Sequence, residues 1–247
     1  MQPRAAFAAR FVLPVALVDL VVLIALGNRY GYHRDELYFR EAGRHPAFGY
    51  DDQPALTPLI GRLSAALFGD TPRGLRVLSA VAMALVVVLV ALLARELRAG
   101  RSAQFLAAIC AGVSAMVLLA GHLLSTETFD VLVWVVAVVL VARLLDEGDP
   151  RLWLAVGATM GIGLENKHLP LLLVAALVVG LALDRRLVPV LRSPWVWAGA
   201  GIALLLWMPN LTWQAAHGWP QLELAGQIRH EEGGENRALL VPFQFAL

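Results

Sequence analysis

Charged and titratable residues gather in the segment YGYHRDELYFRE, which covers residues 30–41. Two of them, Asp35 and Glu36, are adjacent carboxylic acids of the kind that general acid–base catalysis uses. Neighbouring residues of a helix point about 100° apart, so only one of the two can face a given site. The pair could equally be a solvated cluster balanced by the arginines beside it. The segment therefore offers Asp35 and Glu36 as candidate catalytic residues.

Two further acidic positions occur in other segments. Asp52 lies in GYDDQPALTP, where two prolines prevent one regular helix, so that a turn can aim the side chain at a fixed point. Asp130 opens a long apolar run in STETFDVLVWVV, where an unpaired carboxylate costs free energy. Asp52 could instead be a charge at a helix N-terminus, and Asp130 an interfacial residue. Glu127, shortly before Asp130, is interpreted as solvated.

Lys167 in MGIGLENKHLP is the only lysine of the chain. Its compact, mobile ammonium group suits the binding of a phosphate, although it could also reach for lipid headgroups.

A divalent metal of unknown identity is also possible. Asp52, Asp130 and His230 would supply a mixed oxygen and nitrogen ligand set, although no ligand spacing in the sequence requires it. The single cysteine, Cys110, excludes a disulfide within the chain and a thiolate cluster.

The composition places these residues in a membrane protein. Charged residues make up 16% of the chain and hydrophobic residues 59%, whereas soluble proteins have about 25% charged residues. A helix needs about 20 mostly apolar residues to cross a bilayer. We therefore predict an all-α polytopic membrane protein. The expected single spans are 11–27, 77–93, 103–120, 129–145 and 196–211.

The apolar stretch 152–183 is too long for a single crossing. Polar residues and Pro170 interrupt it, which predicts two short helices that turn at residues 165–168. About seven transmembrane helices result.

Arginines predict the orientation, because basic residues near span ends are retained in the cytoplasm. A cytoplasmic N-terminus leaves Lys167 as the only basic residue in the short outer connections. We expect a multi-pass protein of the cell (inner or plasma) membrane with its active site on the outer face. The arginines that would lie inside are Arg95, Arg98, Arg101, Arg143, Arg151, Arg185, Arg186 and Arg192.

We expect one membrane domain over residues 1–247, with two long outer loops at 28–76 and 213–237. The first contains aromatic residues and the amphipathic stretch PLIGRLSAALFG, which is typical of short interfacial helices. The net charge of +1 gives no reason to expect a nucleic-acid partner.

Four motifs resemble those of the GT-C glycosyltransferases that use polyprenyl-phosphate sugars, in particular the protein O-mannosyltransferases and the lipid A aminoarabinose transferases. HRDELYF resembles their Asp-Glu motif after the first span and matches Asp35 to the catalytic residue. YDDQPALTP resembles the second motif and matches Asp52, FDVLVW resembles the Leu-Asp motif and matches Asp130, and GIGLENKHL matches Lys167. The order of motifs and the topology extend the resemblance over essentially the whole chain.

The resemblance implies an inverting hexosyl- or pentosyl-transferase. Asp35 would be the general base towards an acceptor hydroxyl, and Lys167, with Arg44 as a second candidate, would stabilise the leaving phosphate. Asp52 and Asp130 would bind the acceptor or a metal. The implied partners are a polyprenyl-phosphate sugar donor and a lipid, glycan or protein acceptor.

The chain departs from the family pattern at three points. Gln53 stands where the second motif often has lysine, and Ala55 replaces its second proline. The family usually has more spans, whereas the last apolar run of this chain, RALLVPFQFAL, is too short to cross a bilayer. The chain therefore resembles a family member that is truncated at the C-terminus. A non-catalytic remnant is therefore an alternative. A transporter is a further alternative, but it would need more polar residues within the spans than Asp19 and Ser114.

Overall fold

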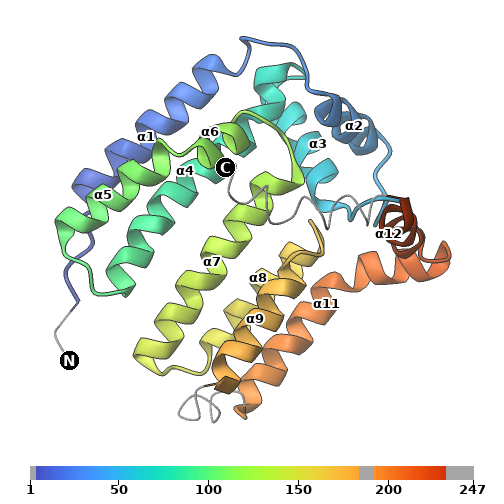
Figure 1. The fold of residues 1–247 in the computed structure, drawn as a ribbon. Coiled ribbons are helices and arrows are strands. Elements are labelled where there is room, and N and C mark those ends of the chain that lie inside the picture. The colour runs from blue at the N-terminus through green and yellow to red at the C-terminus, as the bar shows by residue number, and fades with distance from the viewer. Residues whose placement is uncertain (1–3, 184–191, 232–247) are drawn as a thin grey trace.

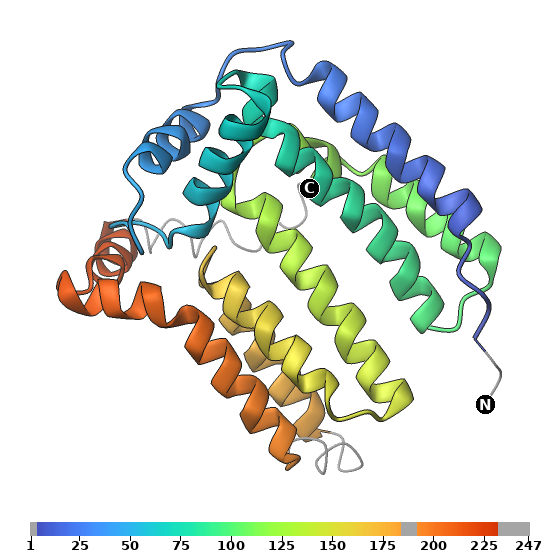
Figure 2. The ribbon, with the colours of Figure 1, turned by 180° about the vertical axis from the view of Figure 1, so that it is seen from behind.

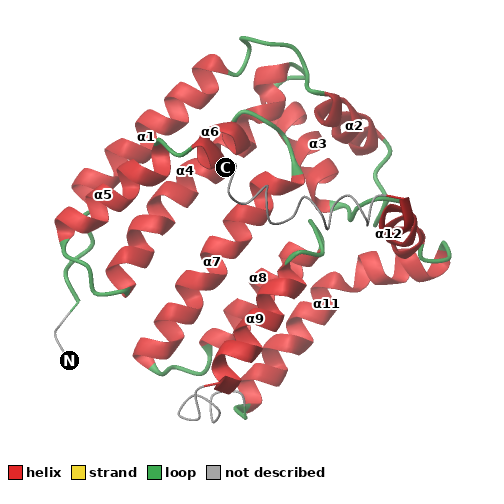
Figure 3. Cartoon of the chain, in the orientation of Figure 1, coloured by secondary structure: helices red, strands yellow, loops and turns green. Residues whose placement is uncertain are grey.

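The computed structural model describes residues 4–183 and 192–231. These residues form helices joined by loops, and their only bridge between extended segments is the isolated one between Gly49 and Pro54 (Figure 3). The helices are α1 (Ala9–Leu26), α2 (Arg34–Arg44), α3 (Leu56–Phe68), α4 (Pro72–Glu96), α5 (Arg101–Gly112), α6 (Ala115–Gly121), α7 (Thr126–Glu147), α8 (Leu152–Leu164), α9 (Pro170–Leu183), α11 (Pro194–Ala216) and α12 (Pro220–Glu231).

The long helices run roughly side by side, so that their connections gather at two ends (Figures 1 and 2). One end carries α2, α3 and the connection between α8 and α9, and we call it the α2 end. The opposite end carries the first described residues and the connections α4–α5 and α7–α8.

Within the described residues, four helices are long and apolar enough to span a membrane, namely α1, α4, α7 and α11. The pair α5 and α6 passes the same test together, which gives up to five spans by length and composition. The predicted all-α polytopic membrane protein is confirmed. The other two predicted spans correspond to α8 and α9, which have 13 and 14 residues.

The span predicted over 103–120 is not one straight helix. α5 and α6 are bent by 55° relative to each other. The side chain of Ser114 accepts a hydrogen bond from the backbone N–H of Val117, and so caps a new helix where the first one ends.

α8 and α11 pack closely because glycines face each other across their contact. A Cβ atom on Gly157 would lie 2.0 Å from the carbonyl oxygen of Gly199. Only residues without side chains permit this approach, which is the usual means of joining helices in lipid. The pair forms the second half of the molecule together with α7 and α9.

An ion-pair cluster closes the end opposite α2. Glu96 is buried there and lies 2.9 Å from Arg4, 3.0 Å from Arg95 and 3.1 Å from Arg143. Arg98, which contributed to the predicted orientation, pairs with Asp146. These arginines therefore also join the N-terminal segment to α4 and α7. Arg185 and Arg186 lie outside the described residues.

The segment 28–76 contains the two short helices expected there, α2 and α3, and the start of α4. The segment 213–237 begins within α11, continues as α12, and leaves the described part of the chain after Glu231. The last apolar run, from Arg237 onward, also lies outside it.

Candidate active site

The start of α2 positions the acidic pair. The backbone N–H of His33 donates to Glu36 at 2.8 Å, and that of Asp35 donates to the ring of His33 at 3.3 Å. These bonds form an N-terminal cap that fixes the first turn of the helix. As the helix geometry predicted, the two carboxylates point differently, because the side chain of Asp35 is 46% exposed and that of Glu36 is 0% exposed.

Glu36 is held by Arg76 of α4 through two hydrogen bonds of 2.7 and 2.6 Å. It also accepts from the backbone N–H of Leu124 at 3.1 Å. Arg76 in turn donates to the carbonyl oxygens of Gly27 and Gly31. A buried ion pair needs such additional hydrogen bonds to offset its desolvation. Glu36 therefore positions α2 against α4 and the loop before α7, and Asp35 is the exposed carboxylate of the pair.

Asp35 lines a pocket of about 230 Å³ at the α2 end. The polar lining comes from His33, Asp35, Ser125 and Glu127, and apolar side chains of α6 and of the following loop complete it. The pocket thus brings the start of α2 together with the start of α7. A small molecule in it would contact Asp35 and Glu127 at once.

Lys167 lies beside this pocket through an ion pair. Its ammonium group is 2.6 Å from the carboxylate of Glu127, with the lysine side chain 32% exposed and the glutamate side chain 55% exposed. Asp130, one turn further along α7, interacts electrostatically with both groups. Asp130 is buried, and its Oδ1 atom has no hydrogen-bond partner among the described residues.

Glu127 has contacts that its sequence pattern did not predict. Its side chain is exposed, as predicted, but it also pairs with the only lysine and lines the same pocket as Asp35. Its position in the first turn of α7, three residues before Asp130, was the available signal, because both side chains then share one face of the helix.

Asp52 is attached to α2 through Tyr38. The hydroxyl of Tyr38 donates to Asp52 at 2.6 Å. Burial, together with this hydrogen bond, raises the pKa of Tyr38 well above its usual range, so the phenol stays protonated. Tyr38 follows Asp35 by three residues on one helix, and so Asp52 lies along the same side of α2 as Asp35.

Asn166 ties three segments of the α2 end together. Its side chain contacts the hydroxyl of Thr57 in α3 at 2.5 Å and donates to the carbonyl oxygen of Thr126 in α7 at 2.8 Å. The backbone N–H of Leu56 donates to the carbonyl oxygen of Glu165 at 2.9 Å. Lys167 follows directly, so these bonds set the position of its backbone relative to α3 and α7.

Two titratable groups flank Lys167. Burial raises the pKa of Glu165 to about 7, although the backbone N–H of Asn210 donates to its carboxylate at 3.1 Å. Burial lowers the pKa of His168, whose ring lies edge-on to Trp207 with the centroids 5.8 Å apart. The connection between α8 and α9 is therefore packed against α11.

Arg44 and His230 lie elsewhere. Arg44 pairs with Glu41 and Asp70 and lines a different pocket from Asp35. His230 is near the end of α12. The structure does not bring Asp52, Asp130 and His230 together, because over residues 4–183 and 192–231 no three histidine, cysteine or acidic side chains are grouped as a metal ion needs.

Comparison with known proteins gives one match. Residues 52–213 match the family described as dolichyl-phosphate-mannose-protein mannosyltransferase. No curated protein and no solved structure matches the chain. The matched region includes Asp52, Asp130 and Lys167 and begins after Asp35, whose catalytic role stays a prediction. Since the match covers more than half of the chain, this protein belongs to the dolichyl-phosphate-mannose-protein mannosyltransferase family of membrane glycosyltransferases.

Proposed function

We propose that this protein transfers a sugar from a polyprenyl phosphate to a hydroxyl group of a lipid, glycan or protein acceptor at the outer face of the cell membrane. Family membership supports a glycosyltransferase with a lipid-linked donor. One observation carries the assignment to a site: Asp35 and Glu127 line one pocket, and Lys167 lies 2.6 Å from Glu127. A candidate base, Asp35, and a cation, Lys167, are thus present in and beside one small pocket.

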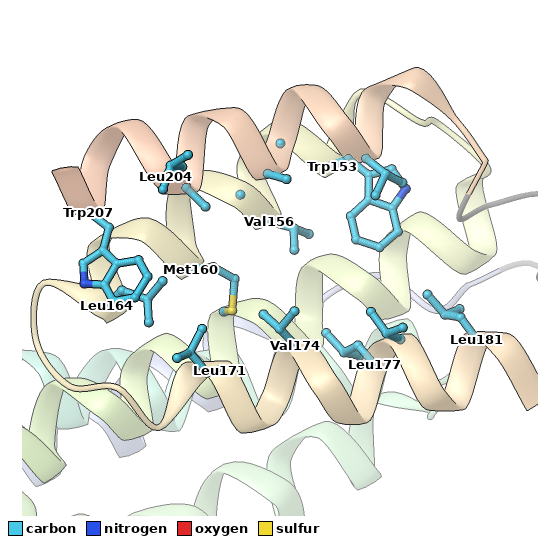
Figure 4. A pocket seen from close by; sticks show the side chains of 16 residues that line it. Trp153, Val156, Met160, Leu164, Leu171, Val174, Leu177, Leu181, Leu204 and Trp207 are labelled. Atoms are coloured by element: carbon cyan, nitrogen blue, oxygen red, sulfur yellow. The ribbon is translucent and has the colours of Figure 1, made fainter. Parts of the chain in front are cut away.

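An apolar groove supports the lipid nature of the donor. It has a volume of about 290 Å³ and lies between α8, α9 and α11. Figure 4 shows Trp153 and Leu181 at one end and Leu164, Leu171 and Trp207 at the other. Leu164 and Leu171 flank the connection that carries Lys167. A polyprenyl chain along this groove would therefore place its phosphate near the lysine.

The reaction proposed for this geometry is a single displacement. The oxygen of the acceptor hydroxyl attacks the anomeric carbon while its proton passes to the carboxylate of Asp35. The bond between that carbon and the phosphate oxygen breaks, and polyprenyl phosphate leaves with the electron pair. Lys167 stabilises the charge on the departing phosphate. The attack occurs opposite the leaving group, so the configuration of the sugar inverts.

The test is sugar transfer by Asp35→Asn in membranes supplied with a panel of polyprenyl-phosphate sugars. The variant keeps the size of the side chain but removes the proton acceptor, and turnover should fall by about a hundred to ten thousand times. The matched control is Asp149→Asn, an exposed residue at the opposite end of the molecule. Equal turnover by Asp35→Asn and the wild type would exclude Asp35 as the base.

A further inference from the structure

A second polar pocket, of about 390 Å³, lies between α2 and α3. Its charged lining consists of three arginines and one carboxylate: Arg40 and Arg44 come from α2, Arg62 from α3, and Asp70 from the connection to α4. We call it the arginine pocket. It shares no lining residue with the pocket that contains Asp35.

The acidic groups around the arginine pocket leave one positive charge without a counterion. Arg40 binds both carboxylate oxygens of Asp70 at 2.5 Å and holds the pKa of that carboxyl below its usual range. Arg44 is shared between Asp70 at 3.3 Å and Glu41 at 3.1 Å. Arg62 is exposed and has no ion pair within the described part of the chain. Three guanidinium groups therefore face two carboxylates.

The close approach of α2 and α3 keeps these like charges together. A Cβ atom on Gly43 would lie 2.6 Å from the carbonyl oxygen of Pro58 and 3.3 Å from the Cβ atom of Arg62. Glycine therefore lets the two helices meet at the point where their arginines converge. Three guanidinium groups that line one pocket repel one another, and a bound anion would offset this repulsion.

An exposed apolar stripe runs along α3 beside the pocket. Leu59, Leu63 and Leu67 follow one another at intervals of four residues and are 41%, 52% and 62% exposed. Such a stripe next to basic residues is the pattern of a helix that lies in the membrane interface, with its apolar face among acyl chains. The arginine pocket and the leucine stripe together would fit a ligand that has an anionic head and a hydrocarbon tail.

We propose that the arginine pocket binds the phosphate of an anionic membrane lipid whose acyl chains lie along Leu59, Leu63 and Leu67. Arginine suits this role, because its planar guanidinium group can donate two parallel hydrogen bonds to phosphate oxygens. A lipid bound there would hold α2 and α3 at the membrane surface. The proposal does not depend on sugar transfer, because it concerns a separate pocket and is tested by binding.

The experiment measures the binding of phosphatidylglycerol to the full chain in detergent micelles by native mass spectrometry over a lipid titration. Loss of one charge-assisted contact in Arg62→Gln should raise the apparent Kd about tenfold. Arg62→Lys keeps the charge and should retain part of the affinity. The matched control is Arg73→Gln, which removes an exposed arginine outside the pocket at the start of α4 and should leave the Kd unchanged.

Two competitors distinguish the source of the phosphate. Diacylglycerol has the chains without the phosphate, and glycerol 3-phosphate has the phosphate without the chains. The proposal expects neither to displace phosphatidylglycerol at equal concentration. Displacement by glycerol 3-phosphate would overturn the lipid assignment in favour of a soluble phosphate. Unchanged binding of phosphatidylglycerol by both Arg62→Gln and Arg44→Gln would overturn the site itself.

Discussion

The ammonium group of Lys167 lies 2.6 Å from the carboxylate of Glu127 and so joins the connection between α8 and α9 to the first turn of α7. The pair is partly exposed, and exposed ion pairs contribute only about 0–1 kcal/mol to stability. The importance of this ion pair is therefore the position that it gives to the ammonium group rather than its contribution to stability. Glu127 keeps the lysine at the edge of the pocket that Asp35 lines.

This relationship predicts the effect of changing the lysine. Lys167→Ala should raise the KM for the polyprenyl-phosphate donor and lower turnover, because the leaving phosphate loses its cation. Lys167→Arg should retain part of the activity, since the charge survives in a different geometry. Neither should change the free energy of unfolding by more than about 1 kcal/mol. Equal donor kinetics for Lys167→Ala and the wild type would leave the lysine with a headgroup contact alone.

Glu36 should behave as a structural residue. Glu36→Gln leaves the buried guanidinium of Arg76 without its charged partner, and breaking a buried pair in this way costs about 3–5 kcal/mol. The free energy of unfolding in detergent micelles measures this loss. Glu41→Gln, an exposed change on the same helix, is the control and should cost little. A fully stable Glu36→Gln variant with no transferase activity would instead assign Glu36 to the chemistry.

Glu165 predicts a pH dependence of stability. Burial raises its pKa from an ordinary value of 4.5 to about 7 in the folded protein. Between these two values the folded state binds one proton more than the unfolded state, so the free energy of unfolding falls as the pH rises towards 7. Glu165→Gln should lose this dependence and be more stable than the wild type at pH 8.

The melting temperature in detergent, recorded from pH 5 to pH 8, checks this expectation. Glu223→Gln, an exposed change on α12, should keep the slope of the wild type. The same slope in Glu165→Gln would mean that another group is responsible.

The apolar groove predicts a dependence on the length of the donor. Ala200 lines the groove and Ala198, on the same helix, does not. Ala200→Trp should therefore reduce transfer from a long polyprenyl-phosphate sugar and spare a donor with only two isoprene units. Ala198→Trp places the same bulk outside the groove and should affect neither donor. Equal loss with both donors would argue against a chain in the groove.

The orientation is tested with single cysteines in a Cys110→Ala background. We expect an impermeant maleimide to label intact cells at Arg73→Cys, near the α2 end, and to leave Arg101→Cys, near the opposite end, unlabelled. We expect this pattern because basic residues near the ends of spans are retained in the cytoplasm, and the predicted cytoplasmic connections carry most of the arginines. The reverse pattern would place the pocket of Asp35 inside the cell.

Local features of the sequence predicted the helices well, because apolar runs and caps are properties of short stretches. The break between α5 and α6 is different, because the apolar pattern predicts one span over 103–120 and a single serine does not interrupt it, whereas in the structure Ser114 caps the second helix. Which of Asp35 and Glu36 is buried and which is exposed could be seen only in the folded structure. It depends on Arg76, which is forty residues further along the chain, and on Leu124.

The hydrogen bonds of Asn166 set an order of events during synthesis. A chain emerges from its N-terminus, so α3 and α7 are made before the asparagine that links Thr57 to Thr126. Until residues 166 and 167 have been made, these two helices lack that connection and Glu127 lacks its lysine. The cation beside the pocket of Asp35 is therefore added only after α8 has been made, although the residues that line the pocket are all made earlier.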